Sequence, residues 1–483
     1  MFSFRRPFFC ESCVKEFPAR LDAQPVVLTD EEKAWRLLSV EEMGGAEYCY
    51  LRLDDDGVLR TGATSHHSLL LREERDLHES LFKRRDGIGA LFATSTLAQG
   101  MNLPSEVVII SGDSRFDPGA DKMKRLEAHE LLNAAGRAGR AGEGAEGFVL
   151  LVPSKVIGFD DAKSEISNHW MDLQAIFEQA DQCLTIDDPM KVVLDQIHNG
   201  ITKNGTPAYL LSKLPLAIAG EVEDPAVAML KRSFAAYRAK VAGDEQWIDT
   251  RIKSTIAARA TVDLPDKDKW IEHLAASTGF SIKLLQQLLD LADSGSFDGS
   301  ATQIVASLIK WLESSPAMLM ELIRPENLEG LLGEEYKKLS IDKERAELAL
   351  PVLATLWPLW MSGVPLCQLE VAFLGRPNKL GRCEHARHFV SRIVADLAFL
   401  AGLPARLLMA RSKAAGETPT IQTVLATLGG AVREGCDGPE SFATRINCGR
   451  SVSRVAARRL YDEIRQQIPS EAIPKALKRP GNA

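Results

Sequence analysis

The fold of this 483-residue chain is decided by the stretch from Leu91 to Gly144, which opens LFATSTLAQGMNLPSEVVIISG (91–112) and closes HELLNAAGRAGRAGEG (129–144). Its first part predicts a buried strand at 90–93, a polar turn at 94–96, a glycine-bearing loop and a second apolar strand at 107–110. Its second part predicts a helix that begins at about Lys124 and ends in a loop with Arg137 and Arg140. Each of these arginines follows a glycine, which suits guanidinium groups that approach a multiply charged anion.

Strand and helix signals alternate on both sides of this stretch, up to Pro153. A short strand is predicted at 2–4, a helix at 10–21, and a last strand at 148–152 (FVLLV). The segment 30–56 is acidic and poorly patterned. The segment HHSLLLREERDLHESLFKRR (66–85) predicts a helix, with Leu70, Leu77 and Leu81 on its apolar side. Such alternation with short connections indicates a parallel sheet with helices on both faces.

The rest of the chain, residues 156–483, reads as helical, because strand signals nearly vanish and apolar residues recur at helical spacing. On the helix predicted at 451–467, Arg454, Arg458 and Arg465 fall along one side. This basic side is open to two interpretations, a contact with nucleic-acid phosphates or a solvated charged face.

Composition narrows the classes of protein to consider. The chain is 45% hydrophobic and 26% charged, and neither an apolar run of roughly 20 residues nor a signal-peptide layout is evident in its sequence. We therefore expect a cytoplasmic protein without membrane contact. The eight cysteines are scattered, which fits a reducing compartment. The net charge of −8 means that nucleic-acid binding requires a local basic surface.

Two motifs carry a family resemblance. ATSTLAQGMNLP (93–104) and NAAGRAGRAG (133–142) resemble motifs V and VI of the superfamily-two helicases, in the Ski-like branch. The order His66-His67-x-x-Leu-Leu-x-x-Glu-Arg before them is similar to a signature of that branch, in which we expect the two histidines to stabilise a loop. The resemblance implies an α/β RecA-like helicase C-terminal lobe at 1–155. A mostly α-helical region would follow it, with a winged-helix-like module at 156–250 and a ratchet-like helical domain at 251–483.

The resemblance also implies roles for single residues. Arg137 and Arg140 would be arginine fingers that reach the triphosphate of ATP. Asn133 stands where the family usually has Gln or His, so its part in positioning the loop or the phosphate is in doubt. The residues implied on the nucleotide side are Gly100, Asn102, Asn133 and Gly136. Thr94 and Thr96 would meet nucleic-acid phosphates, and Arg454 and Arg458 would contact a single strand of DNA or RNA.

Two further motifs are absent from the 483 residues. There is no Gly-x-x-x-x-Gly-Lys-Ser/Thr phosphate loop and no Asp-Glu-x-Asp/His box. We therefore expect ATP and Mg²⁺ to be held by a first RecA-like lobe, and the chain to be inactive alone. Three interpretations stay open: a truncated helicase, the second subunit of a split helicase, or a non-catalytic nucleic-acid-binding or scaffolding remnant. Cys10-x-x-Cys13 and Cys383-x-His385-x-x-His388 have metal-like spacing, but we expect packing roles and no metal.

Overall fold

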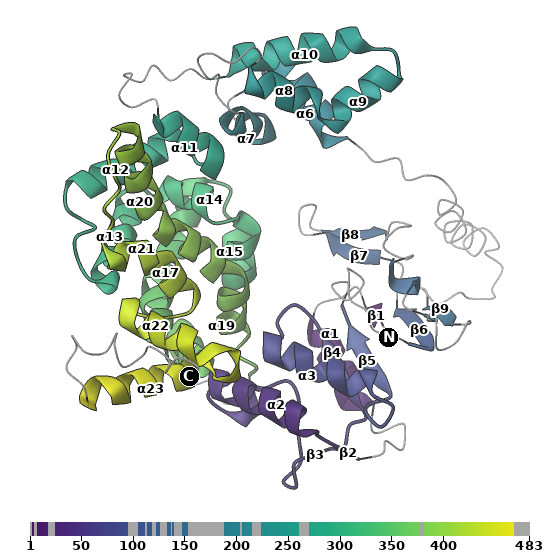
Figure 1. The fold of residues 1–483 in the computed structure, drawn as a ribbon. Coiled ribbons are helices and arrows are strands. Elements are labelled where there is room, and N and C mark those ends of the chain that lie inside the picture. The colour runs from purple at the N-terminus through teal and green to yellow at the C-terminus, as the bar shows by residue number, and fades with distance from the viewer. Residues whose placement is uncertain are drawn as a thin grey trace, which may run out of the picture. The chain divides into compact units, whose positions relative to one another are not determined.

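The computed structural model describes residues 2–3, 7–17, 25–94, 105–111, 114–117, 122–125, 133–136, 138–139, 147–152, 188–202, 205–214, 224–259, 270–376 and 381–467. Contacts divide the chain into two compact units, whose elements are labelled in Figure 1. Unit 1 comprises Met1–Thr185, Gly363–Arg392 and Thr444–Ala483. Unit 2 comprises Ile186–Ser362 and Ile393–Ala443.

A parallel sheet of five strands forms the centre of unit 1, in the order β4-β5-β1-β6-β9. Its strands are β1 (Phe2–Ser3), β4 (Ala63–His66), β5 (Ala90–Ala93), β6 (Val107–Ser111) and β9 (Phe148–Val152). Phe2 pairs with Ala93 on one side and with Ile110 on the other, so the first strand of the chain lies between two later ones. The predicted parallel sheet is confirmed, including the strands expected near 2–4, 90–93, 107–110 and 148–152.

The described α-helices in the first part of unit 1 are α1 (Pro7–Glu16), α2 (Asp30–Met43) and α3 (Arg72–Lys83). Helix α3 confirms the later part of the helix expected at 66–85 and buries Leu77 and Leu81, whereas His66 ends strand β4 and Leu70 lies before the helix begins. The segment 30–56, which looked poorly patterned in the sequence, contains helix α2, which the sequence analysis did not predict. The sequence signal of α2 is a capping box between Thr29 and Glu32 with three acidic residues in the first turn, and not an apolar stripe.

An antiparallel strand pair corrects the start of the helix expected from Lys124, whereas residues 126–132 lie outside the described residues and residues 133–135 are helical. Strand β7 (Ser114–Asp117) pairs in antiparallel fashion with β8 (Lys122–Arg125), and Lys124 lies opposite Arg115. The sequence between the two strands contains Pro118-Gly119, a turn signal that favours a hairpin over a helix start. A second antiparallel pair joins β2 (Val26–Val27) to β3 (Val58–Leu59).

Later segments of the chain belong to the same unit as the sheet. They include α18 (Leu366–Leu374), α19 (Glu384–His388) and α23 (Arg454–Gln467). Gly44, with φ of 83°, ends α2, and a Cβ there would lie 2.6 Å from Cys367 Sγ and 2.7 Å from Pro365 Cβ. The end of α2 thus packs closely on residues more than 300 positions away. The contact units therefore differ from the contiguous division at 155 and 250 expected from the sequence.

The regular secondary structure in the described part of unit 2 consists of helices. Helices α6–α10, within Pro189–Ala258, share one apolar core that includes Leu194, Leu230 and Ile252. The described part of this segment contains helices and no strand, whereas a winged helix would add a β-hairpin. Its further helices are α11 (Trp270–Thr278), α12 (Ile282–Asp293), α13 (Ala301–Ser314), α14 (Leu319–Leu322), α15 (Pro325–Leu332), α16 (Glu334–Lys337), α17 (Asp342–Met361), α20 (Val394–Ala414) and α21 (Thr423–Arg433).

One helical stretch, Glu384–Ala414, is long and apolar enough to cross a membrane by length and composition. This stretch passes by its mean hydropathy of 1.7 and not as an uninterrupted apolar run, since charged residues such as Arg392 and Asp396 lie within it. Of its most apolar window, 56% is buried inside the protein. Within unit 2, α20 meets α21 where a Cβ on Gly429 would lie 2.9 Å from Ala398 O. Such burial is typical of a core helix.

Candidate functional site

The carboxyl ends of strands β4 and β5 carry the first of the predicted site residues. His66 pairs with Ala93 across the two strands, and the next residue, Thr94, donates its backbone N–H to His66 O at 3.1 Å. Thr94 is 7% exposed. The backbone N–H of Thr94 is therefore engaged within the sheet. Thr96, Gly100 and Asn102 lie outside the described residues.

The described part of motif VI lies at the opposite end of the strands. Ser105, two residues before β6 begins, forms a parallel bridge with Ala138 and accepts the N–H of Gly139 at 3.0 Å. Gly139 has a φ of 76°, a conformation that favours glycine. The described residues of motif VI therefore lie beside Ser105, the residue that directly follows motif V, whereas Thr94, near the start of motif V, lies at the carboxyl end of β5.

ATP requires groups that bind its phosphates, and magnesium requires oxygen ligands. Asn133 and Gly136 are exposed, and Gly139 allows a close backbone approach, so this segment suits an anion. Arg137 and Arg140 lie outside the described residues. No group of three or more His, Cys, Asp or Glu side chains that could hold a metal occurs in the described part of the chain. Among the described residues, the groups that suit ATP are therefore the exposed side-chain amide of Asn133 and the turn at Gly139. The described residues contain no set of side chains that could bind magnesium.

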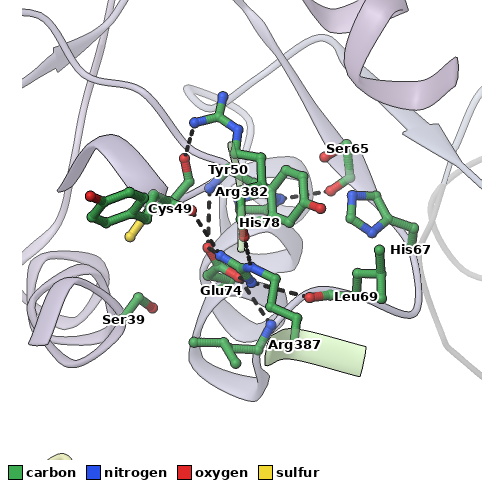
Figure 2. Close-up of polar contacts among 12 residues, drawn as sticks. Ser39, Cys49, Tyr50, Ser65, His67, Leu69, Glu74, His78, Arg382 and Arg387 are labelled. Carbon is green, nitrogen blue, oxygen red and sulfur yellow. Dashed lines mark hydrogen bonds and ion pairs between the residues drawn. The ribbon is translucent and has the colours of Figure 1, made fainter. Parts of the chain in front are cut away.

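A buried ion pair in unit 1 includes Glu74, the glutamate of the histidine signature (Figure 2). Glu74 on α3 faces Arg387 on α19, and both residues are 1% exposed. The two Glu74 oxygens accept from both terminal nitrogens of Arg387, one at 2.9 Å, and from the backbone N–H groups of Tyr50 and Leu71 at 3.1 and 3.0 Å. Such complete pairing is the condition under which a buried charge is tolerated.

All five N–H donors of Arg387 are engaged. Besides its two bonds to Glu74, the guanidinium donates to the carbonyl oxygens of Arg382, Leu69 and Tyr48 at 2.7, 3.1 and 3.1 Å. It also lies 4.6 Å from the centre of the Tyr50 ring. Lysine could not reproduce this arrangement, because it lacks the planar fork. One side chain of α19 thus ties together three segments of the α/β lobe.

The electrostatics of the cluster follow from its burial. Burial opposes the charge of Glu74, but the adjacent Arg387 guanidinium outweighs it and lowers the pKa of Glu74 to about 2. Burial lowers the pKa of His67 to about 3, helped by His78. Burial likewise lowers the pKa of His78 to about 4, against a bond from its Nδ1 to Ser65 O at 2.6 Å. Both histidines are therefore neutral at pH 7.

The His-His-x-x-Leu-Leu-x-x-Glu-Arg signature therefore has a structural role, because its two histidines and its glutamate are buried in this cluster. His66 and His67 are 3% and 1% exposed, and the His67 ring packs edge-on against Tyr50 at 4.5 Å. This burial agrees with the loop-stabilising role expected for the two histidines. Sequence reasoning missed Glu74 and Arg387 as a pair. The available signal was two arginines, Arg382 and Arg387, directly before a strongly apolar helix.

The two arginines predicted to contact a single strand lie in α23. Arg454 is 5% exposed, pairs with Glu42 of α2 at 2.8 Å and donates to Val364 O at 2.6 Å. This placement speaks for a packing role and disfavours a phosphate contact. Arg458 pairs with Asp462 at 3.0 Å and keeps a side-chain exposure of 21%. Arg459, on the same helix, is 63% exposed.

The two metal-like spacings belong to packed regions. Cys10 is buried in an apolar cluster with Ala63 and Phe92, and burial raises the pKa of its thiol to about 12. His385 Nδ1 donates to Glu370 Oε1 at 2.8 Å, and its ring stacks on Phe373 at 4.3 Å. These contacts agree with the packing roles expected from the sequence.

Comparison with known proteins identifies the segment that carries the signature and the motifs. Residues 40–142 match the helicase conserved C-terminal domain. The chain is similar to the RQC trigger complex helicase SLH1 of Saccharomyces cerevisiae, with 32% identity over 110 residues, or 22% of this chain and 6% of that protein. It is 38% identical over 110 residues to the human U5 small nuclear ribonucleoprotein 200 kDa helicase, covering 23% of this chain and 5% of that protein.

A third relative is the ATP-dependent DNA helicase Hel308 of Thermoplasma volcanium, 35% identical over 81 residues, or 17% of this chain and 12% of that protein. The resemblance to Ski-like superfamily-two helicases is thus confirmed for the C-terminal helicase domain. The matches span only a small part of each relative. Arg382 and Arg387 lie outside the matched residues, so the counter-charge of Glu74 comes from beyond the family segment.

Proposed function

We propose that the helicase C-terminal domain of this chain is the second RecA-like lobe of an ATP-dependent helicase or translocase on single-stranded nucleic acid. A first lobe, in a longer natural chain or in a second chain, supplies the phosphate loop and the magnesium ligands. The observation that carries the proposal is the match over residues 40–142, which contribute three of the five strands of the parallel sheet.

Motif V then serves two ligands, and motif VI serves the nucleotide. Thr94 and Thr96 contact phosphates of the strand. Arg137 and Arg140 stabilise charge on the γ-phosphate as it leaves, an effect worth roughly a thousand- to a hundred-thousand-fold in rate. The remaining nucleotide-side residues are Gly100, Asn102, Asn133 and Gly136. When ATP and Mg²⁺ are bound by the first lobe, they supply the phosphoryl group and its charge neutralisation.

Helix α23 contributes to strand binding through its exposed side. Arg454 is buried against Glu42, so we assign the phosphate contact to Arg458 and add Arg459, which is exposed. Both cations attract a strand by charge alone and carry no base specificity. We also propose that the protein is located in the cytoplasm. Whether the strand is DNA or RNA is decided by the experiment below, since the relatives include a DNA helicase and a ribonucleoprotein helicase.

The test is ATP hydrolysis by the purified chain with Mg²⁺ and single-stranded DNA or RNA. We expect no turnover from the chain alone, and turnover when a first RecA-like lobe is added, taken from the neighbouring reading frame or from a Ski-like helicase. Arg140→Ala should lower this turnover about a thousandfold. The matched control is Arg72→Ala, an exposed arginine of α3, which should have no effect.

Two outcomes would overturn the proposal. Turnover by the chain alone that Arg140→Ala abolishes would mean that the nucleotide site is complete without a first lobe. Strand binding that no first lobe converts into ATP turnover would favour the second candidate, a non-catalytic nucleic-acid-binding or scaffolding protein.

A further inference from the structure

A basic segment of unit 2 stands out from the charge pattern of the chain. Residues 225–243, PAVAMLKRSFAAYRAKVAG, contain four cations and no acidic residue, although the whole chain has a net charge of −8. The four cations are Lys231, Arg232, Arg238 and Lys240, and all are exposed. Such a local excess of positive charge favours a polyanionic partner.

Helices α8 (Pro225–Lys231) and α9 (Phe234–Val241) form this segment. Their inner sides join the core of α6–α10 through small side chains and one leucine, namely Ala226, Leu230, Ala235, Ala236 and Ala239. The outer side of α9 carries Phe234, Tyr237 and Val241, which are 44%, 63% and 70% exposed. The larger apolar groups therefore lie on the side of α9 that the core does not use, the reverse of an ordinary surface helix.

The two aromatic rings are arranged for stacking. Phe234 and Tyr237 have ring centroids 6.3 Å apart and planes inclined by only 21°. The guanidinium of Arg238 lies 5.7 Å from the centre of the Phe234 ring. Their spacing of three residues places both rings on the same side of the helix. Exposed, nearly parallel rings next to cations combine base stacking with phosphate attraction.

Acidic residues border the segment on both sides: Glu221, Glu223 and Asp224 precede it, and Asp244 and Glu245 follow it. Asp224 caps α8 at the backbone N–H of Ala226 at 2.9 Å and pairs with Arg259. Asp244 caps α10 (Glu245–Ala258) at the backbone N–H of Trp247. These two carboxylates are therefore engaged within the fold.

We infer that Lys231, Arg232, Phe234, Tyr237, Arg238 and Lys240, the aromatic-basic surface, bind a single-stranded nucleic acid. Bases stack on Phe234 and Tyr237, and backbone phosphates meet the four cations. The class of partner rests on the proposed function, but the site lies outside residues 40–142 and needs no ATP. Four exposed cations beside two exposed, nearly parallel rings favour a nucleic-acid strand, which offers phosphates and bases together, over a protein.

The experiment measures binding of a fluorescent single strand to the full chain without nucleotide, over a range of salt concentrations. We expect Phe234→Ala with Tyr237→Ala to weaken binding about tenfold or more at unchanged salt dependence. Tyr237→Phe should bind normally, because it keeps the ring. Arg238→Ala with Lys240→Ala should flatten the salt dependence by about two phosphate contacts. The matched control is Ile341→Ala with Lys343→Ala, an exposed apolar residue and cation of α17.

A second measurement is independent of stability. A strand that carries 5-iodouracil bases should crosslink under light to the peptide containing Phe234 and Tyr237. Normal affinity in the aromatic variant, with no crosslink to this peptide, overturns the inference and assigns the surface to a protein partner. If strand binding is instead lost with Thr94→Val or Arg459→Ala alone, the proposed function stands and this surface is excluded. A wild-type chain that binds no strand would overturn both.

Discussion

Removing Arg387 leaves the carboxylate of Glu74 buried without a counter-charge. We expect Arg387→Ala to lower the free energy of unfolding of unit 1 by about 3–5 kcal/mol, because neither water nor another cation replaces the five lost hydrogen bonds. Denaturant unfolding followed by circular dichroism measures the change. Lys33→Ala, which removes an exposed pair with Asp30, should cost about 0–1 kcal/mol. Equal effects of the two substitutions would contradict the structural role of Arg387.

The same cluster predicts a dependence of stability on pH. His67 and His78 have folded-state pKa values of about 3 and 4, below their usual 6.5, so the unfolded chain binds protons first as the pH falls. Stability is fully present above pH 6.5 and decreases below it, by up to about 1.4 kcal/mol per pH unit for each histidine. Glu74, with a pKa of about 2 against 4.5, adds its own loss only below pH 4.5.

Replacing one histidine separates these contributions. His78→Gln removes one titrating group, so we expect the decrease in unfolding free energy between pH 6.5 and 4.5 to become about 1 kcal/mol per pH unit shallower. Denaturant midpoints at pH 7, 6 and 5 measure this slope. An identical slope in the wild type and the variant would show that His78 does not titrate differently on folding.

Helix α23 shows how one element can have a structural and an exposed side. Arg454 joins α23 to the carboxylate of Glu42 on α2, whereas Arg459 is 63% exposed. We expect Arg454→Ala to lower the unfolding free energy by about 2–4 kcal/mol and Arg459→Ala by no more than about 1. Calorimetric unfolding tests the first expectation. A stable Arg454→Ala variant with weakened strand binding would restore the phosphate contact predicted from the sequence.

Elements with a clear apolar pattern could be predicted, whereas an element marked mainly by its cap and contacts between distant residues could not. The strands at 90–93 and 107–111 follow from short apolar runs, and α3 follows from Leu77 and Leu81 at helical spacing. Helix α2 was missed because its main signal is the Thr29–Glu32 capping box. At the site, the position of Thr94 followed from its motif. The Glu74–Arg387 pair could not be predicted, because its partners are 313 positions apart and Arg387 belongs to neither motif.

At the scale of the whole molecule, unit 1 is assembled from three separate parts of the chain. The helicase domain match ends at residue 142, yet α18, α19 and α23 belong to the same compact unit as the sheet. Arg382 adds two bonds to this assembly, to the carbonyl oxygens of Glu47 and Cys49 at 3.0 and 2.7 Å. The segment that resembles other helicases therefore has a buried polar face that only later residues of this chain cover.

A fragment of residues 1–155 should consequently not fold cooperatively by itself, because its Glu74 carboxylate and the carbonyl groups of Tyr48 and Leu69 would lose their partners. Adding a fragment of residues 156–483 should restore a cooperative unfolding transition, since it brings α19 and α23. Arg387→Ala in the second fragment should weaken their association about a hundredfold or more, and Lys343→Ala should not. A fragment 1–155 that unfolds cooperatively with the stability of the intact chain would show that the lobe is complete without its later segments.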